Sequence, residues 1–149
     1  MVNEQEKNSI KLEYEIIKDD FSRAGEASSN IKKVLRQLGI DSKAIKKIAI
    51  VTYEAEMNIV IHSEGGKITV LISPNAVEIV ARDNGPGIKN IDKAMEEGYS
   101  TASNKVRELG FGAGMGLPNI KRYSDEFHIE SKIGEFTILK MKIYIQEEV

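Results

Sequence analysis

Glu54 and Asn58 are polar side chains in the stretch YEAEMNIVIHS whose types and spacing suggest chemistry. They lie four residues apart, so on a helix they project from one face, and His62 extends that row by another turn. A carboxylate can accept a proton and a carboxamide oxygen can ligate Mg2+, so the row has the groups for a metal ion beside a general base. A solvated helix face is the alternative that such spacing more often indicates.

A second polar group stands at the end of an expected strand. Asp83 continues the alternating apolar series of AVEIVARD, which places its carboxylate on the core face of a sheet. A carboxylate there is unfavourable unless it is paired or accepts hydrogen bonds. Gly85 and Gly87 permit positive φ and the close approach of a flat ligand, while Pro86 stiffens the turn. The same residue types also form ordinary surface turns.

The third candidate is the run GFGAGMG, in which Gly110, Gly112, Gly114 and Gly116 precede an expected helix near Leu117. Bare backbone amides at the start of a helix form the anion sites of phosphate-binding loops. No Gly-Lys-Ser/Thr follows, so this is not a Walker loop, and no expected strand directly precedes it, so it is not a Rossmann fingerprint. A flexible linker is the alternative for a lone glycine-rich run.

The strands that would carry the second candidate follow from the alternation of apolar and polar residues. Residues 10–16 alternate, and so do KITVLI and AVEIVARD, which are typical of a hairpin around Pro74. FHIES and FTILKMKIYI form a closing pair around Gly134. The sequence therefore predicts about five strands, largely antiparallel.

The helices that would carry the other two candidates follow from helical spacing. One helix is expected from a cap at Asp20 to a stop at Gly39, and a longer one from Asp41 or Ser42 to about Ser63. NIDKAMEEG indicates a short helix, and a last helix follows the glycine run. With the strands, these elements predict a two-layer α/β sandwich, in which a mixed, largely antiparallel sheet has helices on one face.

Composition limits the remaining functions. The 149 residues, 41% of them hydrophobic, suffice for one domain, expected over residues 9–146 after a flexible N-terminus of residues 1–8. A net charge of -2, from 21 basic and 23 acidic residues, gives no electrostatic footprint for nucleic acid. There is no cysteine, no signal peptide and no apolar run long enough to cross a membrane. We expect a cytoplasmic protein without nucleic-acid or membrane partners.

The order of the three motifs adds a resemblance to these separate patterns. EAEMN, then DNGPG at a strand end, then GFGAGMG before a helix resembles the GHKL (Bergerat-type) ATP-binding fold over nearly the whole chain. Within that class the chain looks like the stand-alone bacterial serine/threonine kinases and anti-sigma factors typified by SpoIIAB, RsbW and RsbT. The first motif is similar to the N box of this family, and the other two are similar to its two glycine boxes. EEGYSTASNK and GAGMGLPNIKRYSDEF look most like the RsbT-type switch kinases.

The resemblance implies ATP and Mg2+ as cofactors and assigns roles to the candidates. Glu54 would be the general base that takes the proton from an attacking protein hydroxyl, and Asn58 would ligate Mg2+ beside the triphosphate. Asp83 would accept a hydrogen bond from the adenine amino group, and Thr137 would lie near the adenine. Phe136 replaces a glycine that the family often has before that threonine. The other implied nucleotide-binding residues are Gly85, Gly87, Gly112, Gly114, Met115, Gly116 and Leu117.

The same resemblance implies that the second glycine box ends a mobile lid over the phosphates. Two basic residues of that expected lid, Lys105 and Arg107, either reach the γ-phosphate or are solvated. The first glycine box would shape the adenine pocket. Phosphoryl transfer needs mainly positioning and charge stabilisation, so a base, a Mg2+ ligand and backbone amides suffice.

The implied function is phosphorylation of a serine or threonine on a small antagonist-type protein in a bacterial partner-switching pathway. A sigma factor, a downstream phosphatase and a second copy of the chain are further implied partners. An anti-sigma factor that mainly sequesters a sigma subunit, and a non-catalytic ATP-binding module, are the alternatives. The catalytic half of a histidine kinase needs a phosphoacceptor helix pair, but His62 falls in the motif helix and His128 in a strand. An ATPase of the topoisomerase or mismatch-repair type needs a second domain.

Overall fold

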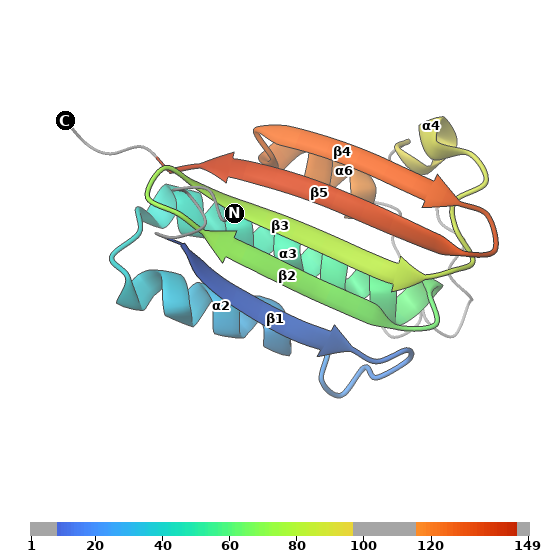
Figure 1. Cartoon of the computed structure of the whole chain (residues 1–149), viewed down its shortest axis with the longest axis horizontal. Helices are drawn as coiled ribbons and strands as arrows, with labels where there is room; N and C mark the ends of the chain where they lie inside the picture. The colour runs from blue at the N-terminus through green and yellow to red at the C-terminus, as the bar shows by residue number, and fades with distance from the viewer. Residues whose placement is uncertain (1–8, 97–115, 146–149) are drawn as a thin grey trace, which may run out of the picture.

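A five-stranded antiparallel sheet forms the front layer of the molecule (Figure 1). The computed structural model describes residues 9–96 and 116–145. Its strands are β1 (Ile10–Ile16), β2 (Gly66–Ile72), β3 (Ala76–Asn84), β4 (Glu126–Lys132) and β5 (Phe136–Tyr144). They lie in the order β1-β2-β3-β5-β4, and each neighbouring pair is antiparallel. The predicted strands and both predicted hairpins are confirmed.

Helices form the second layer, behind the sheet (Figure 1). They are α2 (Glu26–Gln37), α3 (Ser42–His62) and α6 (Gly116–Tyr123), while the short α4 (Ile91–Ala94), which follows β3 along the chain, lies near the end of β4. All of them fall on stretches with helical spacing. The predicted two-layer α/β sandwich with helices on one face is therefore confirmed.

The long helix α3 begins and ends where its sequence predicts. Asp41 is its N-cap, and the carboxylate of Asp41 accepts a hydrogen bond from the Ala44 amide at 3.4 Å. The helix then continues without glycine or proline to His62. Its apolar stripe, which includes the fully buried Ile48 and Val51, packs between the sheet and the other two long helices. This central position lets α3 carry functional side chains toward several neighbours.

The start of α2 differs from the sequence prediction. The helix begins at Glu26, several residues after the expected cap at Asp20, whose carboxylate instead accepts a hydrogen bond from the Ser22 hydroxyl at 2.7 Å. The N-cap residue, Gly25, has a φ of 96° and provides no side chain for capping. A carboxylate on another element does so instead: Glu56 of α3.

Glu56 satisfies the first amides of α2 from across the helix pair. Its carboxylate accepts hydrogen bonds from the amides of Gly25 at 3.0 Å, Ala27 at 3.3 Å and Ser28 at 3.1 Å. The residue is only 2% exposed. Burial raises the pKa of Glu56, and these three hydrogen bonds oppose that rise. Because the acceptor comes from a distant part of the chain, local sequence patterns place the helix start wrongly.

Part of the expected architecture lies outside the described residues. This applies to the N-terminal residues 1–8 and to residues 97–115, which include Lys105, Arg107, Gly110, Gly112, Gly114 and Met115. Among residues 9–96 and 116–145, no helix combines the length and apolar character needed to cross a bilayer.

Candidate functional site

The first group of candidate residues lies where α3 meets the start of α6. Glu54 and Asn58 are both half-buried on α3, as the helical spacing predicts. A Cβ atom built on Gly116 would lie 3.2 Å from Oε2 of Glu54, so the first residue of α6 is close to this carboxylate. Asn119, in the first turn of α6, makes a side-chain hydrogen bond with Glu54. The structure thus brings Gly116 and Glu54 together.

The environment of Glu54 suits a proton acceptor. Burial raises the pKa of its carboxyl above the ordinary value, and the hydrogen bond from Asn119 partly opposes that rise. A carboxylate with a raised pKa holds an accepted proton more strongly than a solvated one does. The half-buried His62, two turns after Glu54, shows the opposite effect, since burial lowers its pKa.

The second group lies at the end of β3. Asp83 is 5% exposed, and the register between β3 and β5 pairs it with Thr137, which is 3% exposed. Both side chains therefore lie on the face of the sheet that the helices cover. Burial raises the pKa of Asp83 to about 6, and a hydrogen bond from the backbone of Thr137 opposes this rise. The predicted position of Asp83 on the core face is confirmed.

The turn after β3 is held against the hairpin that joins β4 and β5. The Gly134 amide donates a hydrogen bond to the Pro86 carbonyl at 2.6 Å, and the Gly85 amide donates one to the Glu135 carbonyl at 2.8 Å. Gly87 has a φ of 81°, and a Cβ atom there would lie 2.6 Å from the Lys132 carbonyl oxygen. Both the backbone angle and the space therefore require glycine at position 87.

A serine that carries no sequence signal completes this contact. The hydroxyl of Ser131, on β4, accepts a hydrogen bond from the Ile88 amide at 2.8 Å. The same hydroxyl lies 2.9 Å from the hydroxyl of Thr137 and 3.1 Å from the Phe136 carbonyl oxygen. Ser131 thus connects the turn after β3 with the residue that is paired with Asp83.

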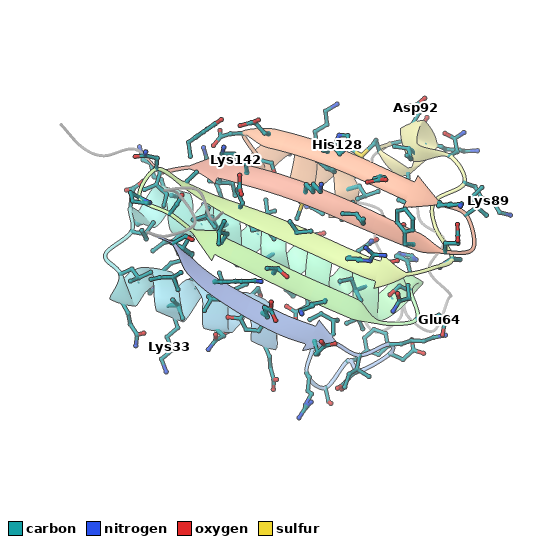
Figure 2. The ribbon with its side chains drawn as sticks, in the orientation of Figure 1. Lys33, Glu64, Lys89, Asp92, His128 and Lys142 are labelled. Carbon is teal, nitrogen blue, oxygen red and sulfur yellow. The ribbon has the colours of Figure 1, made fainter. Side chains whose placement is uncertain are left out.

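The first group stands on α3, and the second stands on β3 and β5, two strands that α3 contacts. The end of β3, the start of β5 and the C-terminal end of α3 lie at the same end of the molecule (Figure 1). The helix also contacts β3, β5 and α6 directly. Glu64, just after α3, and Lys89, just after the turn, mark this end and point away from the sheet (Figure 2). Of the other candidates, Leu117 is buried at the start of α6.

Three candidates, Gly112, Gly114 and Met115, lie outside the described residues and are not placed. Over the part of the chain that the structure describes, no group of three or more His, Cys, Asp or Glu side chains could hold a metal ion.

Comparison with known proteins identifies the family of this arrangement. Residues 17–143 match the family described as the histidine kinase-like ATPase domain. The chain belongs to this family. The match covers every described strand and helix except β1, which carries no candidate residue, and the last residue of β5. A histidine kinase-like ATPase domain uses ATP, which is the nucleotide that the sequence resemblance implies.

Two curated relatives of this ATPase domain are named as a protein kinase and as an anti-sigma factor. The serine/threonine-protein kinase RsbT of Bacillus subtilis is 34% identical over 110 residues, which cover 71% of this chain and 77% of that protein. An anti-sigma F factor of a Thermoanaerobacter species is 33% identical over 114 residues, which cover 73% of this chain and 76% of that protein.

Solved structures show the same fold. The structure of the RsbU and RsbW domains of a Mycobacterium tuberculosis protein has a TM-score of 0.64 at 15% identity, and the match covers 94% of this chain and 34% of that one. A chain of the SiaB-SiaC complex from Pseudomonas aeruginosa has a TM-score of 0.61 at 15% identity, with 89% and 88% covered. The chain thus spans about a third of the first of these proteins.

Sequence patterns did not single out three polar residues of this ATPase domain. Glu56 lies two residues from Glu54 on α3 and faces a different helix. The spacing of residues in the sequence does not show which neighbouring helix each carboxylate faces. Asn119 falls in a first helical turn, where asparagine is ordinary. Ser131 occupies a strand position with no periodic signal, although its neighbour across the sheet, Thr137, was a candidate.

Proposed function

We propose that this chain is an ATP-dependent serine/threonine protein kinase of the anti-sigma regulatory type, which phosphorylates a small antagonist-like partner protein. The observation that carries the proposal is the half-buried Glu54, held at the start of α6 by Asn119. A general base is the group that a transferase needs and that a simple nucleotide-binding module does not. The name of one curated relative, a serine/threonine-protein kinase, supports this choice.

The residues at the end of β3 would hold the adenine of ATP. Asp83 supplies a buried acceptor for the amino group, and Thr137 lies beside it in the β3–β5 register. Gly87 supports the same assignment because only a glycine leaves room for the backbone contact with the β4–β5 hairpin. Among the described residues, only the backbone of Thr137 lowers the pKa of this buried carboxylate, which fits a ligand that donates hydrogen bonds.

The site also fits Mg2+ in the form that nucleotide enzymes use. Mg2+ commonly takes one or two protein oxygens together with substrate phosphates and water. Asn58 offers one amide oxygen, one turn from Glu54 on the same face of α3. When bound, the ion would neutralise charge on the phosphates.

The residues of the chain divide the work of transfer. Glu54 would take the proton of the partner hydroxyl while the hydroxyl oxygen bonds to the transferred phosphoryl group and the bond to the ADP oxygen breaks. Asn119 would hold the Glu54 carboxylate in place. The glycine box before α6, with Gly112, Gly114 and Met115 in its undescribed part, would close over the phosphates.

A second candidate function is sequestration of a sigma subunit, with phosphorylation serving to release it. The similarity to an anti-sigma F factor favours this candidate. The SiaB-SiaC structure shows a protein of this fold in a complex with another protein. A sigma factor, a downstream phosphatase and a homodimer remain proposals for this chain, as does a cytoplasmic location.

The decisive experiment follows transfer of label from γ-labelled ATP to a lysate of the native cells. Wild type should label a small protein on serine or threonine. Glu54→Ala should still bind ATP, because the base does not hold the adenine, but should lose transfer by about a hundredfold or more. Calorimetry measures ATP binding, and gel autoradiography with phosphoamino-acid analysis measures transfer.

Glu64→Ala is the matched control, because Glu64 is exposed just after the same helix and pairs with Lys18 at 2.8 Å. It should leave both binding and transfer unchanged. Undiminished transfer by Glu54→Ala would remove Glu54 as the base. ATP binding by wild type without any transfer would favour the non-catalytic module, and a pull-down that recovers a sigma subunit would favour sequestration.

A further inference from the structure

Three polar side chains form a row across three neighbouring strands. The register pairs Asp83 on β3 with Thr137 on β5, and Thr137 with Ser131 on β4. Directly paired residues of antiparallel strands hold their side chains on the same face of the sheet, within reach of one another. Thr137 therefore stands between a carboxylate on one side and a serine hydroxyl on the other.

The contacts of Ser131 fix the direction of its hydrogen bonds. Its oxygen accepts a hydrogen bond from the Ile88 amide at 2.8 Å. It also lies 3.1 Å from the Phe136 carbonyl oxygen, which can only accept a hydrogen bond. A serine has one hydroxyl proton and two lone pairs. The proton must therefore go to Phe136 if that contact is to be a hydrogen bond.

This direction determines the role of the neighbouring threonine. The hydroxyl oxygens of Ser131 and Thr137 are 2.9 Å apart, and either is able to donate. Because the Ser131 hydroxyl donates its one hydrogen bond to the Phe136 carbonyl, Thr137 must be the donor in the hydrogen bond between the two hydroxyls. All three contacts of Ser131 are then satisfied. The Thr137 oxygen is left with lone pairs only, on the residue that the strand register pairs with the acceptor Asp83.

We infer that Ser131 is a specificity-determining positioning residue of the proposed nucleotide site, because it accepts the hydrogen bond of the Thr137 hydroxyl and so leaves Thr137 and Asp83 as a pair of hydrogen-bond acceptors. Such a pair selects a purine edge that carries an amino group. A purine with a carbonyl oxygen at the same position would bring a third acceptor against the pair, which leaves a buried polar group without a partner. This inference rests on the proposed nucleotide site and concerns its choice of base.

The test compares ATP with inosine triphosphate, which carries a carbonyl oxygen in place of the amino group. Wild type should bind ATP more tightly. In Ser131→Ala the Thr137 proton is free to turn toward the nucleotide and to meet the carbonyl oxygen of inosine. The ratio of ATP affinity to inosine triphosphate affinity should fall about three- to tenfold, as expected for one hydrogen bond. Calorimetry with each nucleotide and Mg2+ measures the ratio.

Two further variants separate this role from a structural one. Ser131→Thr keeps a hydroxyl on a strand position that suits a β-branched side chain, so it should restore the wild-type ratio. Thr137→Val removes the hydroxyl through which Ser131 acts, so Ser131→Ala in that background should change the ratio no further. Should Ser131→Ala not fold, Ser131→Cys keeps the shape with a poor hydrogen-bonding group and tests the same ratio.

Ser73→Ala is the matched control. The Ser73 hydroxyl also bonds a backbone carbonyl next to a strand, that of Ala76 at 2.9 Å, but in the β2–β3 turn at the opposite end of β3. It should leave both affinities unchanged. Equal losses for both nucleotides in Ser131→Ala, or an unchanged ratio, would overturn the inference. Absence of ATP binding by wild type would instead overturn the proposed function. Loss of phosphoryl transfer alone would leave the inferred preference for adenine unchanged.

Discussion

At the scale of single residues, Asp83 shows that the site opposes the stability of the fold. Its carboxylate is almost fully buried, and burial raises its pKa to about 6. At pH 7 the Asp83 carboxyl group is therefore mainly ionised, although its buried surroundings favour the protonated form. A residue that only supported the fold would be apolar here, like the other core-facing residues of β3.

Replacing Asp83 with asparagine should stabilise the protein and weaken ATP binding at once. The folded pKa lies above the unfolded one, so ionised Asp83 destabilises the fold above pH 6, and this effect is relieved as pH falls from 6 to 4. At pH 7, Asp83→Asn should raise the free energy of unfolding by about 1–3 kcal/mol, after allowance for solvent screening. ATP affinity should fall about ten- to a hundredfold.

Urea unfolding of both proteins at pH 7 and pH 4.5 measures the stability, and calorimetry measures the affinity. The stability gain of the variant should shrink at the lower pH, since wild-type Asp83 is then largely protonated when folded. Equal stability at pH 7, or unchanged ATP affinity, would contradict the role of Asp83 as a strained acceptor for adenine.

The same pKa predicts how ATP binding depends on pH. Only the ionised carboxylate is an acceptor at both oxygens, so ATP affinity of wild type should decrease as pH falls through about 6. Asp83→Asn has no group titrating there and should lose this step. Titrations with ATP between pH 5 and pH 8, corrected for protonation of the nucleotide with the variant as reference, measure the effect. An identical pH profile in both proteins would refute it.

At the scale of elements, the sequence predicts best where contacts are local. The alternation of β2 and β3, and the Asp41 cap of α3, depend on neighbouring residues, and both predictions are confirmed. The start of α2 was predicted wrongly because its amides bind Glu56 on another helix. Ser131 was missed for a similar reason, since its partners lie on other segments. Residue types thus indicate where helices and strands form. Tertiary hydrogen bonds decide where α2 begins and which further residue, Ser131, contacts the site.

Removing the shared cap should destabilise the helix layer. Glu56→Ala leaves three amides at the start of α2, two of them buried, without their acceptor, so the free energy of unfolding should fall by about 2–4 kcal/mol. Urea unfolding at pH 7 measures the change. Glu26→Ala, which removes an exposed acid from the first turn of the same helix, is the control and should change stability by less than about 1 kcal/mol. Similar losses in the two variants would argue against a capping role.

Two glycines of similar backbone angle test the contact between the turn and the hairpin. Gly87 has a φ of 81° and no room for a Cβ atom, whereas Gly134 has a φ of 79° with nothing within 4 Å of that position. Gly134→Ala should therefore cost only backbone strain, about 1 kcal/mol. Gly87→Ala should cost more and also weaken ATP binding several-fold, because the turn must move away from Lys132. Thermal unfolding and calorimetry measure both effects, and equal behaviour of the variants would exclude a tight contact.

At the scale of the whole molecule, the two ends of the sheet have different tasks. The β2–β3 turn at one end is a short connection, closed by the Ser73 hydroxyl. At the other end, the turn after β3, the β4–β5 hairpin and the end of α3 come together (Figure 1). The resemblance drawn from the order of the motifs implies that Asp83 and Thr137 lie near one adenine, and the antiparallel pairing of β3 with β5 places the end of one strand beside the start of the other. The lid remains a prediction, since residues 97–115 are not described.

The pair of carboxylates on α3 has a consequence for how the helix layer holds its shape. Glu54 and Glu56 are two positions apart, which on a helix is a rotation of roughly 200° about its axis. One carboxylate contacts α6 and the other contacts α2, so turning α3 to improve one set of contacts would break the other. The angular phase of α3 is thereby fixed from both sides. The hydrogen bonds of Glu56 to α2 thus oppose rotation of α3 about its axis, and this keeps the proposed base, Glu54, directed toward the start of α6.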